Sequence, residues 1–253
     1  MASRCKNPSA ALLVTVAGLL LVRTAAADDI DVPLCQAPSA GNVRVVTGAP
    51  YTALGTSETV TTLPDGNRVV RQNHIRLWRD SGGRTRSEIS LSSIAGTPPV
   101  ELHTTVTVID DPAARQRYML RPGENVAVTV PILPCRSEAS LEPDLTVGPP
   151  RPANLPLLVS SPVALGERKV NGETVAGRRI EATLPAGAAG NPQPIRMSAE
   201  QWYGKDLQVV IEATYEDPRT GETRYRLSDI ARGEPDAHLF QVPDNYVKQP
   251  ARH

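Results

Sequence analysis

Alternation of apolar and polar side chains is the feature that most limits how this chain can fold. Apolar residues occupy every second position of 207–215, and Thr223, Tyr225 and Leu227 alternate with arginines after the turn residues Asp217–Gly221. Successive side chains of a strand point to opposite faces, so a period of two predicts a hairpin with one buried face. The same alternation recurs at 179–184 and 126–130.

Turn residues divide the first half of the chain into further strands. Pro64-Asp65-Gly66-Asn67 and Ser81-Gly82-Gly83 are turn sequences with extended runs on either side. They predict a three-stranded meander. The expected strands are 56–63, 68–79 and 84–91, followed by 101–110, 116–120 and 126–133. We expect short helices only at 235–239, where Pro235 suits a first helical position, and at 156–164.

A proline-rich stretch separates two β-rich halves. Residues 134–162 contain seven prolines, which neither a central strand nor a helix interior tolerates. We interpret the stretch as a surface connection between halves 43–133 and 163–247 of a single β-rich domain, residues 28–253. Its length also allows a lid over a cleft.

The N-terminus reads as a cleavable secretory signal peptide, residues 1–27. Arg4 and Lys6 precede the apolar stretch Ala10–Val22, and small residues lead to a predicted cleavage between Ala27 and Asp28. The alternative is an uncleaved anchor, but the apolar stretch has 13 residues, whereas a spanning helix needs about 20. We therefore expect a soluble periplasmic or secreted product with no membrane span in the mature chain.

Removal of the signal changes both the charge and the cysteine count. The remaining chain has 24 basic and 27 acidic side chains, a balance that gives no reason to expect nucleic acid as a partner. Cys35 and Cys135 are the only cysteines left, and in an oxidising compartment an even count favours one disulfide. Two separate buried thiols are the alternative.

No motif for catalysis or metal binding stands out. The chain has no G-x-S-x-G, and its histidines show no H-x-H or H-x-x-x-H spacing. His74 and His103 could meet on neighbouring strands with His238 or Asp110 to hold a metal, but ordinary strand histidines explain them better. Asp110-Asp111 precede a proline and face opposite ways on a strand, so a turn is expected. We predict no catalytic residue, no metal and no cofactor.

Two surface features have both a functional and a structural interpretation. Four arginines lie around one hairpin near Glu88 and form either a cationic patch or a salt-bridged sheet face. They are Arg76, Arg79, Arg84 and Arg86. Residues 186–195, small and apolar, form a hairpin tip that is either a contact loop or a flexible insertion.

Three groups of segments resemble those of a known family. They are Arg79–Glu88 with Val108–Pro112 and Tyr118–Leu120, Leu165–Gly172 with Gly177–Ile180, and Gln201–Tyr203, Asp206–Gln208, Asp217–Arg219, Gly221-Glu222, Tyr225–Leu227 and Leu239–Pro243. Over residues 50–247 the chain resembles a group of uncharacterised exported bacterial proteins. Their layout is similar to the LolA-like superfamily of outer-membrane lipoprotein carriers and sensors.

This resemblance implies a fold and a class of function. The expected fold is mainly β, or α+β: a strongly curved antiparallel sheet or half-barrel with a few short helices. The expected function is a non-enzymatic binding protein that shelters a lipid, acyl chain or hydrophobic peptide, with Val209, Ile211 and Tyr225 as candidate lining. The alternative is an envelope interaction or sensor module that binds a protein partner with its sheet and loops.

Overall fold

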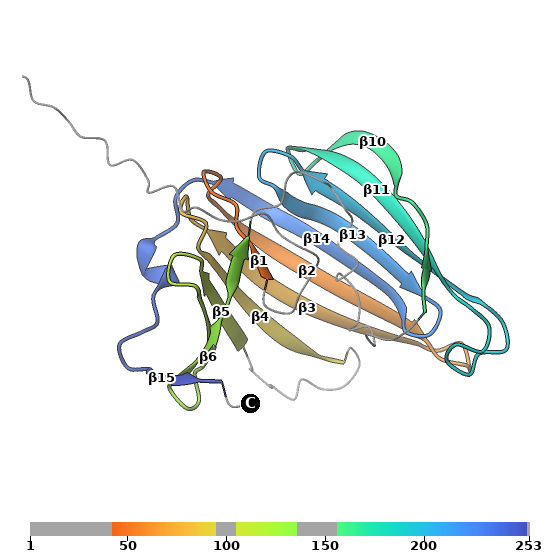
Figure 1. Cartoon of the computed structure of the whole chain (residues 1–253), viewed down its shortest axis with the longest axis horizontal. Coiled ribbons are helices and arrows are strands. Elements are labelled where there is room, and N and C mark those ends of the chain that lie inside the picture. Colours follow the sequence, from red (N-terminus) through yellow and green to blue (C-terminus); the bar gives the residue numbers. More distant parts are fainter. Residues whose placement is uncertain (1–41, 95–104, 136–155, 252–253) are drawn as a thin grey trace, which may run out of the picture.

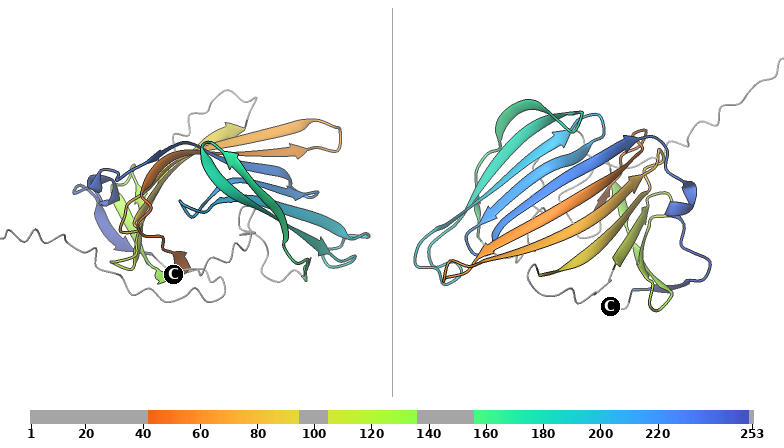
Figure 2. Two further views of the ribbon diagram at one scale, coloured as in Figure 1. Left: turned by 90° about the horizontal axis from the view of Figure 1, so that it is seen from above. Right: turned by 180° about the vertical axis from the view of Figure 1, so that it is seen from behind.

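The structure is a computed structural model that describes residues 42–94, 105–135 and 156–251. These residues form one long, strongly curved sheet and a separate two-stranded pair (Figures 1 and 2). The strands are β1 Asn42–Arg44, β2 Tyr51–Thr62, β3 Arg68–Arg79, β4 Thr85–Ile94, β5 Thr105–Asp111, β6 Gln116–Arg121, β7 Val126–Pro131, β8 Leu133–Cys135, β9 Leu158–Val159, β10 Val163–Val170, β11 Glu173–Leu184, β12 Ile195–Gly204, β13 Val209–Asp217, β14 Gly221–Arg232 and β15 Val247–Pro250; the 3₁₀ turn η1 spans Ala237–Phe240.

The large sheet runs β10-β11-β12-β13-β14-β2-β3-β4-β5-β6-β7-β15, with β9 beside β11. Its pairs are antiparallel except for β15, which runs parallel to β7. In the described part of the chain β10 and β15 are the end strands of this order and do not pair with each other. The pairing of β14 with β2 joins strands far apart in sequence into one surface. The strongly curved, unclosed antiparallel sheet expected from the sequence is therefore present.

Most of the expected strands match the observed ones. The meander appears as β2, β3 and β4, and the hairpin of alternating residues appears as β13 and β14. Gly221, which opens β14, has φ +100°, and a Cβ there would overlap the Val60 carbonyl oxygen. Only glycine fits this turn, because any side chain would collide with the backbone of β2.

The helix expected at 156–164 is wrong. Residues 158–159 form β9 against β11, and β10 begins at Val163. Prolines at 156 and 162 bracket the segment, and pairing with β11 satisfies its backbone groups. The helix expected at 235–239 is a single 3₁₀ turn, Ala237–Phe240, capped by the Asp236 side chain, which accepts from the His238 amide at 2.9 Å.

The two faces of the sheet can be assigned from η1. Figure 2 shows this turn on the outer, convex side of the sheet, and the Arg86 side chain on β4 donates to the Leu239 carbonyl oxygen at 2.9 Å. Arg86 and its cross-strand neighbours therefore face the convex side. The alternate residues, which include Ile89 on β4 and its partner Ile75 on β3, face the concave side.

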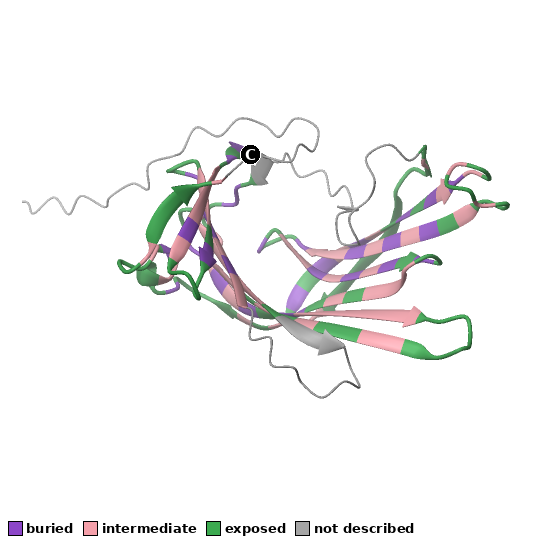
Figure 3. Cartoon of the chain, turned by 90° about the horizontal axis from the view of Figure 1, so that it is seen from below, coloured by how far each residue is buried: buried purple, intermediate pink, exposed green. Residues whose placement is uncertain are grey.

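The two arms of the sheet bury opposite faces. In the arm β11–β14 the buried clusters are on the concave side: one contains Ile211 and Leu227, and the other contains Leu184 and Met197. In the arm β5–β7 the buried cluster Ile109, Leu120 and Ala127 is on the convex side, where Val242 and Tyr246 of the C-terminal segment cover it. Figure 3 shows the resulting alternation of buried and exposed positions along the strands.

Several expectations concern residues outside the described ones. These are the signal peptide 1–27 with its cleavage at Ala27 and Asp28, Cys35, His103, and most of the proline-rich connection, 136–155. In the part of the chain that the structure describes, no helix has the length and apolarity needed to cross a membrane.

Candidate ligand site on the concave face

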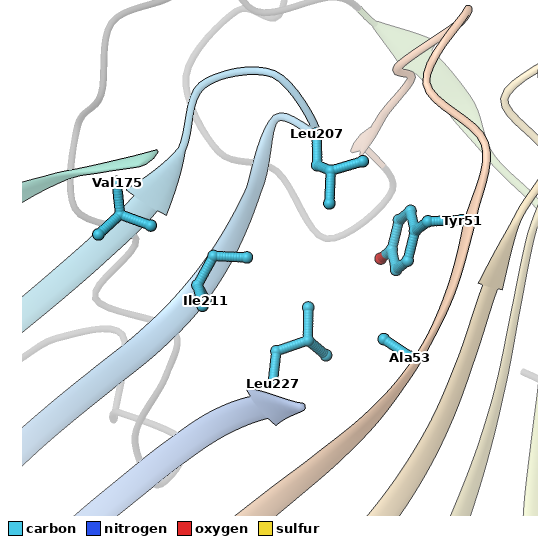
Figure 4. Close-up of a cluster of buried hydrophobic side chains, with 6 residues drawn as sticks. All are labelled: Tyr51, Ala53, Val175, Leu207, Ile211 and Leu227. Carbon is cyan, nitrogen blue, oxygen red and sulfur yellow. The ribbon is translucent and has the colours of Figure 1, made fainter. Parts of the chain in front are cut away.

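The candidate lining residues Val209, Ile211 and Tyr225 come together at one end of the concave face. Ile211 is fully buried in a cluster with Tyr51, Ala53, Val175, Leu207 and Leu227 (Figure 4). Val209 and Tyr225 are half-buried and pack against the same cluster. Figure 4 shows the six side chains of the cluster directed toward a common centre from four strands and the loop before β13. Ile211 is thus part of a packed core, while Val209 and Tyr225 border it.

Burial of this cluster affects its tyrosines. Desolvation raises the pKa of Tyr225 well above its usual value. The pKa of Tyr51 is also raised by burial, although the nearby Arg79 guanidinium opposes the shift. Both side chains are therefore neutral hydrogen-bonding groups in an apolar setting.

A row of partly exposed apolar side chains continues from this core onto the arm β3–β7. We call it the concave lane. Its members are Ile75, Leu77, Ile89, Val106, Val108, Met119 and Val128. Direct strand pairs connect them: Ile75 opposes Ile89, and Val108 opposes Met119. None of the seven is fully buried, and Met119 is 39% exposed. Leu77 also packs against the core cluster, so lane and core form one apolar surface.

The lane ends at a buried arginine. Arg79 follows Leu77 by two positions on the same face of β3 and is 5% exposed. Its Nε and Nη2 donate to the Ala49 carbonyl oxygen at 3.0 and 2.8 Å, and Nη2 also donates to the Leu207 carbonyl oxygen. The guanidinium lies 4.7 Å from the ring centre of Tyr51, its cross-strand partner. A cation thus lies at one end of the concave lane.

Outside the part covered by the C-terminal segment, the convex face carries many charged side chains. Three grooves bordered by described residues lie mostly over its charged side chains, and the largest, about 780 Å³, is bordered by Arg179, Glu181 and Glu216. In the groove at the middle of the sheet, Arg168 lies 3.8 Å from the ring centre of Trp202 and 2.5 Å from a Glu212 carboxylate oxygen. Opposite charges on this face pair with one another, and the face stays hydrated.

The arginines around the β3–β4 hairpin do not form one patch. Arg84 pairs with Asp80 and Arg86 with Glu88, each at 2.6 Å, while Arg76 is exposed. The interpretation as a salt-bridged face holds for Arg84 and Arg86. It is wrong for Arg79, which points to the concave side, because alternation along β3 and burial beside Tyr51 direct it there.

Other candidate groups have structural partners. Asp110 accepts from Arg117 at 2.6 and 2.8 Å, and Asp111 accepts from the Ala114 amide at 2.9 Å, as expected for residues on opposite faces before a turn. His74 and His238 are exposed on different elements. Among the described residues no three His, Cys, Asp or Glu side chains are grouped so that they could hold a metal.

Cys135 is buried at the end of β8, and β8 pairs in parallel with β1. Its predicted partner Cys35 lies outside the described residues, so the disulfide stays a prediction. The hairpin tip 186–195 appears as the connection between β11 and β12, where Gly187 and Gly190 have positive φ.

The sequence interpretation missed the concave lane. A signal for it is present in the alternation of Ile75 with Leu77 and of Val106 with Val108. It could not be read as a site, because the sequence does not say that the C-terminal segment covers the opposite face of this arm. The hairpin with the most regular alternation, β13–β14, forms part of the buried core instead.

The fold and the lane define the class: an open half-barrel of antiparallel strands with a row of apolar residues on its inner face. Solved structures similar to this chain include an uncharacterised conserved protein from Thermus thermophilus. It shares 9% identity with this chain at TM-score 0.40, covering 80% of this chain and 90% of that one.

LprF from Mycobacterium bovis shares 13% identity at TM-score 0.35, over 79% of this chain and 91% of its own. A LolA superfamily protein from Nitrosomonas europaea shares 11% identity at TM-score 0.30, over 79% and 93%. No family model and no curated protein matches the sequence. These similarities do not identify a ligand.

Proposed function

We propose that this protein is a non-enzymatic binding protein that shelters an apolar ligand, such as a lipid, an acyl chain or a hydrophobic peptide, against the concave face of its sheet. The observation that supports it is the concave lane. Seven apolar side chains lie on one inner face without being fully buried, and they adjoin a packed core that holds the sheet in its curve. Apolar surface of this kind typically marks a ligand or partner site.

The proposal includes the route of the protein. We infer that residues 1–27 direct export and are removed before Asp28, and that the mature domain acts as a soluble periplasmic or secreted protein with Cys35 joined to Cys135. N-terminal sequencing of the exported protein tests the cleavage. Intact mass with and without alkylation and reductant tests the disulfide.

The test of binding compares adjacent residues that face opposite ways. Ile75 is on the lane and its neighbour His74 is exposed on the convex side of the same strand. The lane variant is Ile75→Gln combined with Val108→Gln, and the control is His74→Gln. The readout is fluorescence of the uncharged probe N-phenyl-1-naphthylamine, which brightens in apolar sites.

We expect the wild type and His74→Gln to bind the probe equally. The lane variant should bind it at least about tenfold more weakly, because two buried contacts of about 1 kcal/mol or more are lost. Thermal melts check that all three proteins are folded. Equal binding by the lane variant, or recovery of only bare protein by native mass spectrometry after gentle purification, contradicts the proposal.

The alternative is an envelope interaction or sensor module. The charged convex grooves favour it, since paired Arg and Glu side chains suit a polar protein partner. Capture of one envelope partner that is lost on Arg226→Glu, together with no binding of the probe, supports this function over carriage.

A further inference from the structure

Two arginines stand together at the end of the concave lane. Arg79 is buried, as described above. Arg44, at the end of β1, is exposed; its Nη2 donates to the Tyr203 hydroxyl and reaches Gln208 Oε1 at 3.4 Å. Its guanidinium lies 5.2 Å from the ring centre of Tyr203. The described hydrogen bonds of Arg44 all leave from Nη2.

Neither arginine has a carboxylate partner among the described residues, although acidic side chains are close in the fold. Asp80, next to Arg79 in sequence, accepts from the backbone amide and Nε of Arg84 at 2.7 and 2.6 Å. Glu173 and Asp206 both accept from Arg232, and Glu234 accepts from the Ser81 amide. The local carboxylates are thus committed to other donors.

This arrangement leaves uncompensated positive charge. Burial lowers the pKa of Arg79, and the neighbouring Arg44 acts in the same direction. Two backbone carbonyls and a tyrosine ring solvate the buried guanidinium, but they do not neutralise it. A buried cation is normally paired with an anion.

The position of the pair relative to the lane indicates which ligand fits. Leu77 and Arg79 share one face of β3, so an apolar molecule on the lane has one end near Arg79. The two arginines contact adjacent residues, since Arg79 donates to the Leu207 carbonyl oxygen and Arg44 reaches Gln208 Oε1. An apolar surface that ends in two guanidinium groups is complementary to an amphiphile with an anionic head.

We propose that Arg44 and Arg79 bind the anionic head, a carboxylate or a phosphate, of an amphiphile whose apolar part lies along the concave lane. The inference rests on the proposed function, because it names the chemical class of the ligand at that site. The exposed Arg44 supplies donors to the head, the buried Arg79 supplies fixed positive charge, and the Tyr203 hydroxyl adds a neutral donor or acceptor.

The test is displacement of N-phenyl-1-naphthylamine by ligands of equal chain length and different heads: dodecanoate, dodecyl phosphate and the uncharged dodecanol. Sodium acetate and inorganic phosphate, which have the head chemistry without the chain, distinguish a lipid head from a free anion. The variants are Arg44→Gln and, as a matched control, Arg121→Gln, an exposed arginine at the end of β6.

We expect the wild type to prefer dodecanoate or dodecyl phosphate over dodecanol by about tenfold, the size of one charge-assisted hydrogen bond. Arg44→Gln should lose most of this preference while its dodecanol affinity is unchanged, and Arg121→Gln should keep it. The preference should also fall as salt is raised.

Equal affinity of the wild type for dodecanol and dodecanoate overturns the inference, even if both bind well and the proposed function stands. An unchanged preference in folded Arg44→Gln overturns it too. Displacement by acetate or phosphate alone at the concentrations that suffice for the amphiphiles would assign the site to free anions instead. Failure of the uncharged probe and of dodecanol to bind at all contradicts the proposed function itself.

Discussion

The arms β11–β14 and β5–β7 belong to one sheet but bury opposite faces. In the first arm the concave side holds the packed clusters around Leu227 and Met197. In the second arm the C-terminal segment packs on the convex side over Ile109, which leaves Val108 and Met119 partly exposed inside. A curved sheet can therefore bury the inner face of one arm as a core and leave the inner face of the other partly exposed.

The largest expected effects come from the two cores. Leu227→Ala in the first arm and Ile109→Ala in the second should each lower the free energy of unfolding by about 2–5 kcal/mol, because both side chains are fully buried. Urea unfolding of purified protein measures the change. A loss below about 1 kcal/mol for Ile109→Ala would break the comparison, since the convex cluster would then not be a core.

The buried Asp217 at the end of β13 tests a charged contact of the first arm. It is 2% exposed and accepts from Arg219 Nε, Arg219 Nη2 and the Tyr215 hydroxyl. Asp217→Asn should cost about 1.5–3 kcal/mol at neutral pH.

Although burial alone would raise it, the bonds from Arg219 hold the pKa of Asp217 below its usual 3.8. A carboxylate with a lowered pKa stabilises the fold above pH 3.8, and this stability is lost as pH falls from there toward the lower folded value. Urea midpoints of wild type and Asp217→Asn should converge over this acid range. Parallel curves down to pH 2 would contradict the assignment.

Substitution of Gly177 tests side-chain packing on the convex face of the first arm. A Cβ at this position would lie 2.6 Å from the Trp202 ring. The Arg168 guanidinium lies 3.8 Å from the centre of the same ring. Gly177→Ala should lower stability by about 1–3 kcal/mol, because the ring must move away from the strand. Gly123→Ala, where a Cβ has open space, is the control. Similar melting temperatures for both variants would show that Trp202 moves freely.

The tyrosines distinguish the arms at high pH. Burial raises the pKa of Tyr51 and Tyr225 in the first arm above 10.0. Above pH 10.0 these groups ionise in the unfolded chain but stay protonated in the fold, so stability falls as pH rises. The double variant Tyr51→Phe/Tyr225→Phe should flatten this loss in melts between pH 9 and 12. Tyr118→Phe should flatten it less, because the Tyr118 side chain is more exposed.

The smallest effect is expected on the lane. Met119 is 39% exposed, so Met119→Ala should change stability by about 1 kcal/mol or less. Thermal melting measures it beside Ile109→Ala of the same arm. A loss as large as that of Ile109→Ala would show that the inner face of this arm is also core.

Much of the fold could be predicted from local pattern. Alternation around Ile211 and Tyr225 and the turn before Gly221 predict the hairpin, because strand period and turn chemistry are local properties. The helix predicted for 156–164 is wrong, since the pairing of this segment with β11 depends on residues far along the chain. The candidate site could not be predicted in this way. Which of Ile211 and Val108 is fully buried depends on which face of the sheet is covered by segments that are distant in the sequence.

The position of Arg79 could not be predicted for the same reason, because it depends on residues that are distant in the sequence. Its sequence neighbours Asp80 and Arg84 suggest a surface ion-pair cluster, and two of the three residues do pair. Its actual partners, the carbonyls of Ala49 and Leu207, are backbone groups that carry no sequence signal.

The β14–β2 pairing also sets the order of events during folding. Thr59 and Thr223, whose hydroxyls lie 3.0 Å apart across this pair, are separated by 164 residues of sequence. Closing so long a loop is entropically costly and slows folding. A ribosome that makes the chain from its N-terminus must complete β14 before the centre of the sheet can assemble. Until then β2 keeps an unpaired edge that is open to a chaperone or to another chain.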